Sequence, residues 1–586
     1  MDNTVFHYTA ARNTQIVLYL LKAHGIRKVI ASPGTQNMSL VLSMQQDPFF
    51  EMYSAADERS AAYMACGLSA ESGEPVVLSC TGATASRNYV PGLTEAFYRH
   101  LPVVAITSTQ HITSVGHDIP QVIDRSTIQK DIAKCSVLAR NVNNDDDAWD
   151  CMIQVNKALL ELNHHGKGPV HINLEKSETT DFSVTDLPSC RVIQRYSSSD
   201  ELPALPQGKK GIFVGAHTAF TAAETEAIEK FCEVNNAVVF CDHTSNYKGE
   251  HRVLFSLVAS QEWYVSPCLQ LSVLIHIGQV SGDYFQQGKL GAYAKEVWRV
   301  DEDGLLKDPF KKMTKVFEMS DLDFFTSYAN GRSMPGKSLL ESCREEKKRI
   351  SGKIPNLPFG NIWMAQQLAP HLPENSFIHF GILNSLRSWN FFEIPSSVNS
   401  SCNVGGFGID GGVSTLVGSS LAHPDRIHFG VFGDLAFFYD MNVLGNHHVR
   451  QNLRILLVNN AVGSEFKLYL HPASRFGKEA NKFIAAGGHY GNKSPLLVKH
   501  YAEDLGFEYI TAHNKDEFLS VCEHFLTPEI TERPMLFEVF TDELNESNAL
   551  KTMNSLEMPS TDKAKQKLRS IIGDSAYKRL SSIIHK

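Results

Sequence analysis

One carboxylate and one carboxamide each follow an apolar, β-prone run in the last third of the chain. The run 426–432 leads into Asp434, and the run 453–458 leads into Asn460. The carboxyl ends of neighbouring parallel strands meet at the edge of an α/β sheet where ligands bind. Carboxylate and carboxamide oxygens suit Mg²⁺, which keeps coordination places for phosphate oxygens. The spacing favours a magnesium and phosphate site, although on spacing alone both side chains could equally cap loops of an ordinary βαβ unit.

A glycine cluster upstream of this pair adds a second candidate for anion binding. Residues 405–412 read GGFGIDGG and precede a small-residue segment, 413–422, with helical spacing. Glycine permits positive φ and a close approach of main-chain N–H groups to a phosphate. A flexible loop is the alternative, but the helix that follows favours a phosphate cradle.

Three short turns in the first third of the chain also follow strand-like runs. They are SPGT at 32–35, DER at 57–59 and CTGATA at 80–85. A glycine turn that opens a helix can hold an anion, but SPG alone is a weak signal. A lone DER is more often a surface glutamate, here Glu58, paired with Arg59. His111 and His117 follow the next run, 101–106, and an imidazole suits proton transfer near neutral pH, although most isolated histidines are structural or merely exposed.

Strand-like runs alternate with helix-like segments throughout the chain. This alternation predicts an α/β protein of three doubly wound, Rossmann-like parallel sheets. We place the domains at 1–189, 190–347 and 348–545, followed by a C-terminal extension, 546–586, that suggests a surface helix or an oligomer arm. No GxGxxG motif follows a strand of the middle domain, so dinucleotide binding is not indicated.

Composition limits the classes of function. The 586 residues are 43% hydrophobic and 20% charged with a net charge of -9, which is typical of a globular enzyme and lacks the basic stripe of a nucleic-acid-binding protein. No apolar run is long enough to span a membrane, and the N-terminus lacks the pattern of a signal peptide. The eleven cysteines form no CxxC pair, which favours free thiols in a reducing compartment. We therefore predict a cytoplasmic enzyme with small-molecule substrates.

The motifs together resemble the thiamine-diphosphate (ThDP) enzymes. Gly433-Asp434 followed by Asn459-Asn460 is similar to the metal–diphosphate motif of that family, with Leu435 in place of its usual second glycine. SPGT, DER, TGATA and the GPV run at 168–170 resemble, in the same order, the pyrimidine-binding domain of these enzymes. The resemblance extends over residues 1–543. It implies a pyrimidine-binding domain, a central domain and a diphosphate-binding domain, with ThDP and Mg²⁺ as cofactors.

The resemblance also assigns roles to residues. Asp434, Asn460 and the backbone carbonyl of Val462 would hold the metal. Glu58 would be hydrogen-bonded to the aminopyrimidine ring and favour the tautomer that removes the thiazolium C2 proton. Ile409 would be the apolar wedge that bends the cofactor, with Phe407 as the alternative if the register is off by two. The other residues implied to bind the cofactor are Ser32, Pro33, Gly34, Thr81, Gly82, Ser385, Leu386, Gly408, Asp410, Gly433, Leu435 and Phe466.

Within the family, the run GDL followed by YDMN, the NSL at 384–386 and GIDG at 408–411 resemble the SEPHCHC synthases of menaquinone biosynthesis, which use 2-oxoglutarate. The resemblance makes His111 and His117 candidates for proton handling and Gln121 a candidate for substrate contact. It also implies a homo-oligomer, a dimer or a dimer of dimers, with active sites at the subunit interface where Glu58 and Asp434 come from different chains.

The chain departs from these synthases where they bind substrate. Gln36 stands where their SPGSR turn has an arginine, and Val404 stands at about the place of the arginine before GIDG. The arginine after NSL appears here as Arg387, two places early. Isochorismate and 2-oxoglutarate are polyanions that favour arginine clamps. We therefore expect a different and less anionic pair of substrates.

The resemblance implies an enzyme that decarboxylates a 2-oxo acid donor and transfers the resulting enamine to an acceptor of unknown identity. Two further enzyme readings are a simple 2-oxo acid decarboxylase and a ThDP-dependent C–C lyase or hydrolase. A different class is a non-catalytic, ThDP-fold binding subunit. The presence of Glu58, Asp434 and Asn460 favours an enzyme over that last alternative.

Overall fold

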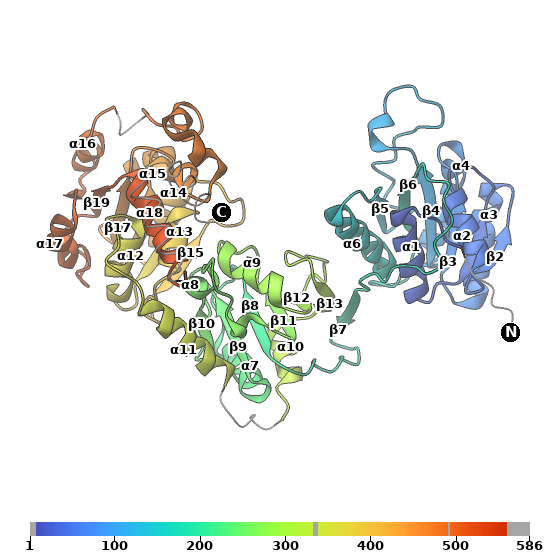
Figure 1. Ribbon diagram of the computed structural model, residues 1–586, viewed down its shortest axis with the longest axis horizontal. Helices are drawn as coiled ribbons and strands as arrows, with labels where there is room; N and C mark the ends of the chain where they lie inside the picture. The colour runs from blue at the N-terminus through green and yellow to red at the C-terminus, as the bar shows by residue number, and fades with distance from the viewer. Residues whose placement is uncertain (1–6, 332–337, 490–492, 560–586) are drawn as a thin grey trace, which may run out of the picture. The chain divides into compact units, whose positions relative to one another are not determined.

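The computed structural model describes residues 7–331, 338–489 and 493–559, and these residues form three parallel sheets with interleaved helices (Figure 1). The α/β prediction is confirmed. The chain forms two compact units, one of residues 1–196 with 304–316 and one of residues 197–303 with 317–586. The three predicted segments each contain one sheet, while the domain boundaries at 189, 347 and 545 stay predictions.

The first sheet has the strand order β2-β1-β3-β4-β6-β5, so the chain winds in both directions from its centre. Its strands are short apolar runs, as predicted, and end at the polar turns described above. They are β1 (Lys28–Ala31), β2 (Glu51–Ser54), β3 (Val76–Cys80), β4 (Val103–Thr109), β5 (Cys135–Ala139) and β6 (Val170–Glu175).

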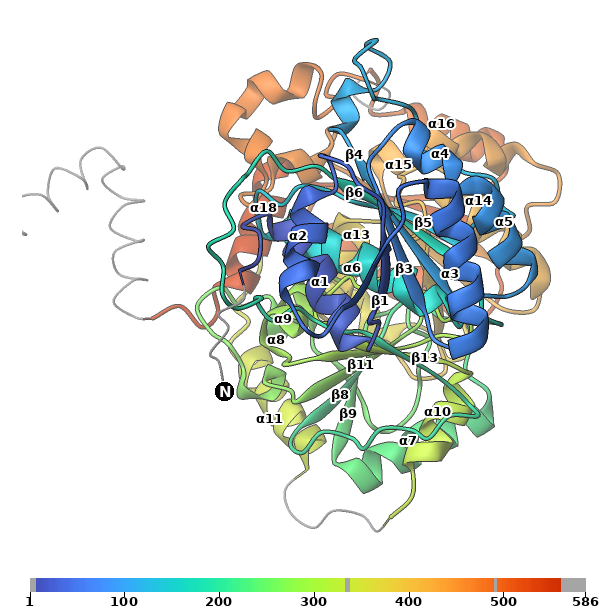
Figure 2. The ribbon, with the colours of Figure 1, turned by 90° about the vertical axis from the view of Figure 1, so that its right-hand side faces the viewer.

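Helices cover both faces of this sheet. Alternate strand residues point to opposite faces, so Val29 and Val77 pack in one apolar cluster and Ile30 and Leu78 in another. Figure 2 shows α1 and α6 on one side and α3 and α5 on the other. The helices are α1 (Arg12–Ala23), α2 (Met38–Gln46), α3 (Glu58–Ser72), α4 (Thr84–Asn88), α5 (Val90–Tyr98) and α6 (Asp145–Glu161).

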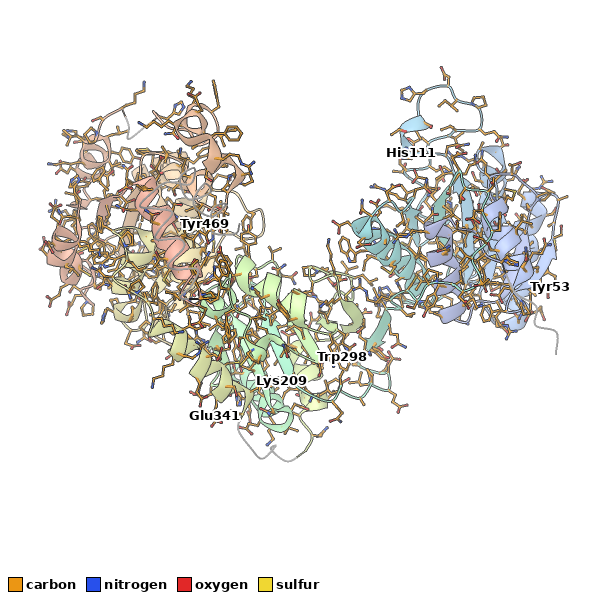
Figure 3. The ribbon with its side chains drawn as sticks, viewed as in Figure 1. Tyr53, His111, Lys209, Trp298, Glu341 and Tyr469 are labelled. Carbon is orange, nitrogen blue, oxygen red and sulfur yellow. The ribbon has the colours of Figure 1, made fainter. Side chains whose placement is uncertain are left out.

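The second sheet contains the order β10-β9-β8-β11-β12. Its central strands are buried along their whole length, and Trp298 on β12 is among the buried side chains (Figure 3). The strands are β8 (Lys210–Val214), β9 (Ala237–Cys241), β10 (Arg252–Leu254), β11 (Val273–Ile277) and β12 (Val297–Val300), and β7 (Gln194–Ser197) and β13 (Met313–Glu318) lie where the chain passes between the units. The helices are α7 (Ala222–Asn235), α8 (Ser256–Ala259), α9 (Tyr284–Tyr293), α10 (Asp321–Tyr328) and α11 (Leu339–Ser351).

The third sheet has the order β15-β14-β16-β17-β19-β18, and all its strands pair in parallel. The strands are β14 (Phe377–Phe380), β15 (Asn399–Cys402), β16 (His428–Gly433), β17 (Leu453–Asn459), β18 (Glu508–Ala512) and β19 (Met535–Phe540). The helices are α12 (Asn361–Leu368), α13 (Asn384–Trp389), α14 (Gly412–Ala422), α15 (Asp434–Asp440), α16 (Leu497–Asp504), α17 (Lys515–Phe525) and α18 (Glu543–Asn554).

The start of the predicted C-terminal extension is not a surface helix. Residues 546–554 belong to α18, and Glu546, Leu550 and Met553 are each no more than 1% exposed. The helix packs against the third sheet's own elements because its apolar residues recur at helical spacing. The rest of that extension, 560–586, lies outside the described residues. Among the described residues, no helix combines the length and apolarity that crossing a membrane requires.

Candidate active site

In the first unit, the turns after β1 and β3 pack directly on each other. A Cβ atom placed on Gly34 would lie 2.8 Å from the Cβ atom of Thr81, closer than real side chains approach. Glycine therefore permits this contact, as the residue type suggested. Ser32 is buried beside it, whereas Pro33 and Gly34 are exposed. One edge of the first sheet thus carries the five predicted cofactor residues of this unit, Ser32, Pro33, Gly34, Thr81 and Gly82.

Two glutamine side chains close over the second of these turns. Gln36 donates from Nε2 to Oε1 of Gln121 at 2.9 Å, and its own Oε1 accepts from the backbone N–H of Gly82 at 3.3 Å. A Cβ on Gly82 would lie 2.9 Å from Oε1 of Gln36. The position where an arginine was expected therefore carries an uncharged amide whose donor and acceptor are both engaged. Sequence reasoning predicted Gln121 here but not its pairing with Gln36.

Glu58 is the first residue of α3 and half-buried. Asp57 caps this helix by accepting from the N–H of Arg59, and the Arg59 guanidinium lies 4.0 Å from Asp57. The surface pair of Glu58 with Arg59 is therefore absent from the described structure. Burial raises the pKa of the Cys80 thiol to about 12, and the Glu58 charge adds to that rise. Glu58 therefore lies close enough to Cys80, the last residue of β3, for its charge to be felt there.

The two predicted histidines lie on the loop after β4, and Figure 3 labels the first of them, His111. Nδ1 of His111 is 2.7 Å from the hydroxyl of Thr113, and its Nε2 is 3.7 Å from Glu175. His117 is exposed farther along the same loop. In the part of the chain that the structure describes, neither histidine is hydrogen-bonded to Glu58 or to the glutamine pair. Their role in proton transfer stays a prediction.

In the second unit, Asp434 begins α15 at the carboxyl end of β16. It is 4% exposed, and burial raises the pKa of its carboxyl group to about 7, although the backbone N–H of Leu435, at 2.8 Å, offsets part of that effect. No lysine, arginine or histidine of the described residues forms an ion pair with it. Asn460 and Val462 lie at the end of the neighbouring strand β17 and are both 8% exposed. This buried, uncompensated carboxylate beside a carboxamide fits a divalent cation.

The glycine cluster forms the turn before α14, as predicted. Gly411 has φ 75°, and a Cβ on Gly412 would lie 2.9 Å from the ring of Phe432, so glycine lets the helix start close to β16. Gly408 and Ile409 are partly buried and Asp410 is exposed on this turn. The first turn of α14 thus lies near Asp434, as a diphosphate cradle would require.

The predicted NSL turn is instead the first turn of α13. Ser385 and Leu386 are 3% and 1% exposed, because this helix is packed in the interior of the unit. Gly463 brings the loop after β17 against Phe466 and Leu435, since a Cβ there would lie 2.9 and 3.3 Å from those side chains. Within the second unit, the segments that carry predicted cofactor residues therefore meet at one edge of the third sheet.

Arg387 is occupied by an acidic partner that the sequence did not suggest. Its two terminal nitrogens donate to the carboxylate of Glu465 at 2.9 and 3.0 Å, which is a bidentate pair. Val404, near the other expected arginine position, is a buried apolar residue. Tyr284 packs with its ring 5.6 Å from that of Phe407 on the same side. Glu465 and Tyr284 thus contact residues of the candidate site, and the sequence did not predict either contact.

Strained backbone marks these turns. Several of the described non-glycine residues with positive φ lie in these turns, among them Ala83 (53°), Gln121 (63°), Leu383 (62°), Phe407 (56°) and Ala461 (66°). Such conformations cost free energy and cluster at functional sites. Their placement supports a site at both sheet edges.

Comparison with known proteins defines the class. Residues 12–128 match the family model described as "Thiamine pyrophosphate enzyme, N-terminal TPP binding domain". Together with the relatives below, this shows that the chain belongs to the thiamine-diphosphate-dependent enzymes.

The similarity extends to particular enzymes. The chain is 32% identical over 571 residues to a 2-succinyl-5-enolpyruvyl-6-hydroxy-3-cyclohexene-1-carboxylate (SEPHCHC) synthase of Bacteroides thetaiotaomicron, covering 93% of this chain and 98% of that protein. Enzymes of the same name from Phocaeicola vulgatus and Bacteroides fragilis are 29% and 30% identical, again over 93% of this chain and 98% of their own. The predicted membership of this enzyme family is confirmed, and the chain is a ThDP-dependent enzyme of the decarboxylating carboligase type.

Glu546 on α18 links α12 and α13 through hydrogen bonds of its buried carboxyl group. Its carboxylate accepts from the N–H of Asn361 at 3.0 Å and from the amide of Asn384, the first residue of α13, at 3.4 Å. Burial raises its pKa to about 7. Because this exceeds the unfolded value, the charged form is disfavoured in the folded protein. The wild type should therefore lose stability as pH rises from about 4.5 to 7.

Replacing Glu546 with Gln should remove that loss. We expect Glu546→Gln to be about 2–3 kcal/mol more stable relative to wild type at pH 8 than at pH 4.5. Chemical unfolding at both pH values measures the difference. Glu523→Gln, an exposed position on α17, is the matched control and should follow the wild type. Parallel pH profiles for wild type and Glu546→Gln would contradict the assignment.

Proposed function

We propose that this ThDP-dependent carboligase uses Mg²⁺ and acts on substrates with fewer carboxylates than those of its relatives. The product for which the relatives are named contains succinyl, enolpyruvyl and ring-carboxylate groups. The observation that carries the proposal is the bidentate pair of Arg387 with Glu465. A guanidinium held in this way has its charge neutralised within the protein and is not free to clamp a substrate carboxylate.

The remaining substrate-side residues support the same conclusion. Gln36 and Gln121 present a neutral amide pair, and Val404 presents an apolar side chain. An uncharged amide recognises a polar group through one or two hydrogen bonds, but it does not offset the desolvation of a carboxylate. We therefore propose a 2-oxo acid donor with an uncharged side chain, and an acceptor that meets the Gln36–Gln121 pair.

The roles proposed for this chain's residues follow from their positions. Bound ThDP supplies the carbon nucleophile and the electron sink that decarboxylation of a 2-oxo acid requires. Glu58 would hold a proton at the pyrimidine ring, and the turns at 32–35 and 80–85 would seat that ring. Asp434, Asn460 and the carbonyl of Val462 would hold Mg²⁺, with the first turn of α14 against the diphosphate. Gln121, His111 and His117 would contact the reacting groups.

We also propose a homo-oligomer that completes the site. Each unit exposes large apolar side chains close to its own group of site residues, which is unusual for a surface that stays in water. Beside Glu58 the exposed residues are Tyr53, Tyr63 and Met64, and beyond the loop after β17 they are Leu470, Phe476, Phe483 and Ile484. All eleven cysteines are free, which suits a reducing compartment, and we propose the cytoplasm.

The substrate proposal is tested with a panel of 2-oxo acid donors. We expect kcat/KM for donors with uncharged side chains to exceed that for 2-oxoglutarate, and Glu465→Gln, which frees Arg387, to lower the KM for 2-oxoglutarate. Detection of CO₂ together with the coupled product separates carboligase from simple decarboxylase, and from a lyase or hydrolase that releases no CO₂. Turnover of isochorismate with 2-oxoglutarate at about 1 s⁻¹ or faster would show that the relatives' substrates are retained.

Glu58 is tested by hydrogen–deuterium exchange at C2 of bound ThDP, quenched in acid and read by NMR. Glu58→Gln keeps the size and one hydrogen bond but loses the acid–base function, so exchange should slow by roughly 10²–10⁴-fold while ThDP binding stays near normal. Glu51→Gln, at the opposite end of β2, should exchange like wild type. Unchanged exchange in Glu58→Gln would remove Glu58 from the reaction, and absence of exchange in wild type would favour the non-catalytic reading.

The metal is tested by calorimetry of ThDP binding. Asp434→Ala should weaken binding more than about tenfold, because the cation that neutralises the diphosphate loses its carboxylate. Asp425→Ala, an exposed residue before β16, should bind normally. Equal ThDP affinity with and without EDTA would contradict the metal assignment.

The shared site is tested by complementation between two inactive variants. If Glu58 and Asp434 of one site come from different chains, a mixed dimer of Glu58→Ala and Asp434→Ala has one intact site. Equal mixing with free exchange should restore about a quarter of wild-type activity. Failure to recover activity, when differently tagged subunits demonstrably exchange, would place both residues in one chain.

A further inference from the structure

A basic hollow of about 400 Å³ lies in the second unit, on elements that carry none of the site residues described above. It is lined by the chain that leads into β10, by the second half of α11 and by residues 393–396. Figure 3 labels Glu341 near the start of α11, and the hollow begins one turn farther along that helix. All its lining residues belong to one compact unit.

The hollow gathers more positive than negative charge. Five cations line it, against the two carboxylates of Glu250 and Glu393; the cations are Lys248, Arg252, Arg344, Lys347 and Lys348. Opposite charges normally intersperse on a protein surface, because like charges close together repel. A concentration of this kind in a concave site attracts anions.

The pairing within the hollow leaves three of the cations uncompensated. Glu393 accepts from both Arg252, at 2.9 Å, and Lys347, so one carboxylate serves two cations. Lys248 donates to the carbonyl of Val398 at 2.6 Å, and Arg344 donates to the carbonyl of Glu250 at 2.5 Å. Neither of these two, nor Lys348, forms an ion pair with a carboxylate in the described part of the chain.

The charges in this hollow lie close together, with Lys248 and Arg252 partly buried and Glu393 44% exposed. Burial, together with the charge of the neighbouring Arg252, lowers the pKa of Lys248 to about 8. Burial alone would raise the pKa of Glu393, but Lys347 and Arg252 hold it at about 2. A second anion in the hollow would relieve the repulsion between Lys248 and Arg252, which Glu393 alone does not cancel.

We propose that this hollow binds a small organic anion that carries two phosphate groups. A phosphate monoester brings about 1.5 to 2 negative charges and three acceptor oxygens in a small volume. Two such groups therefore carry enough charge to balance Lys248, Arg344 and Lys348, which form no ion pair among the described residues. Lysine and arginine together are the side chains that proteins use for such groups.

A bound anion would alter the contacts of residues 389–396, which begin at the end of α13 of the candidate site. Glu393 stands four residues after the end of α13, which carries Ser385 and Leu386. The buried His243 fixes this segment through Nε2, which lies 3.0 Å from the carbonyls of both Trp389 and Phe392. The anion would compete with Glu393 for Arg252 and Lys347, and so change the anchoring of residues 389–396.

The probe is fructose 1,6-bisphosphate, titrated by calorimetry into the full chain loaded with ThDP and Mg²⁺, so that the diphosphate cradle is filled. We expect one site per chain, with an affinity that falls as salt is raised. Lys348→Glu and Arg344→Glu should each weaken binding at least tenfold, while Lys348→Arg and the remote surface change Lys230→Glu on α7 should bind like wild type. Fructose serves as the uncharged ligand control.

Hydrogen–deuterium exchange with the same probe locates the site without any substitution. Uptake should change in peptides that cover 244–253, 340–351 and 389–397. No saturable binding, unchanged affinity in both charge-reversed variants, or exchange changes confined to other segments would each overturn the proposal. Citrate that binds as tightly as the bisphosphate would overturn the assignment to phosphate groups.

Discussion

A carboxylate buried at the end of a strand sets the requirements for the diphosphate side of this enzyme. Asp434 is almost inaccessible to water, and the backbone N–H of Leu435 stabilises its charge only in part. A charged group in such a position is unfavourable unless a cation or further donors accompany it. The neighbouring strand supplies oxygens at Asn460 and Val462, and the glycine turn before α14 leaves space for an anion. The turns at this edge of the sheet therefore surround a buried negative charge that a cation would balance.

Support for that edge comes from a helix at the end of the described chain. Glu546 on α18 accepts from the backbone of α12 and from Asn384 at the start of α13. A second buried carboxylate, close to the same segments, is fixed by neutral donors and not by a cation. These hydrogen bonds fix the position of Glu546 without placing a positive charge near the site. No cation that would compete for the charge of Asp434 is therefore added there.

Sequence reasoning predicted the strands well because each is a short apolar run that ends in polar or glycine residues. The strand-like runs before Ser32, Asp57, Thr81 and Asp434 are the strands β1, β2, β3 and β16. It missed the partners that depend on distant parts of the chain. Arg387 and Glu465 are 78 residues apart, and Asn384 and Glu546 are 162 residues apart. No local periodicity records such pairs, since tertiary packing alone brings them together.

The predicted cofactor side and the predicted substrate side differ in how they are built, and only the first leaves a local pattern in the sequence. The cofactor edge depends on backbone geometry at Gly34, Gly82 and Gly412, where a Cβ atom would meet its neighbours. Glycine spacing announces such turns in the sequence. The substrate edge depends on the ends of side chains, whose availability is decided by their partners. Arg387 would appear in a sequence as a free cation, yet its charge is spent on Glu465. A change of substrate can therefore arise from new partners for a few side chains, while the turns predicted to seat ThDP keep their form.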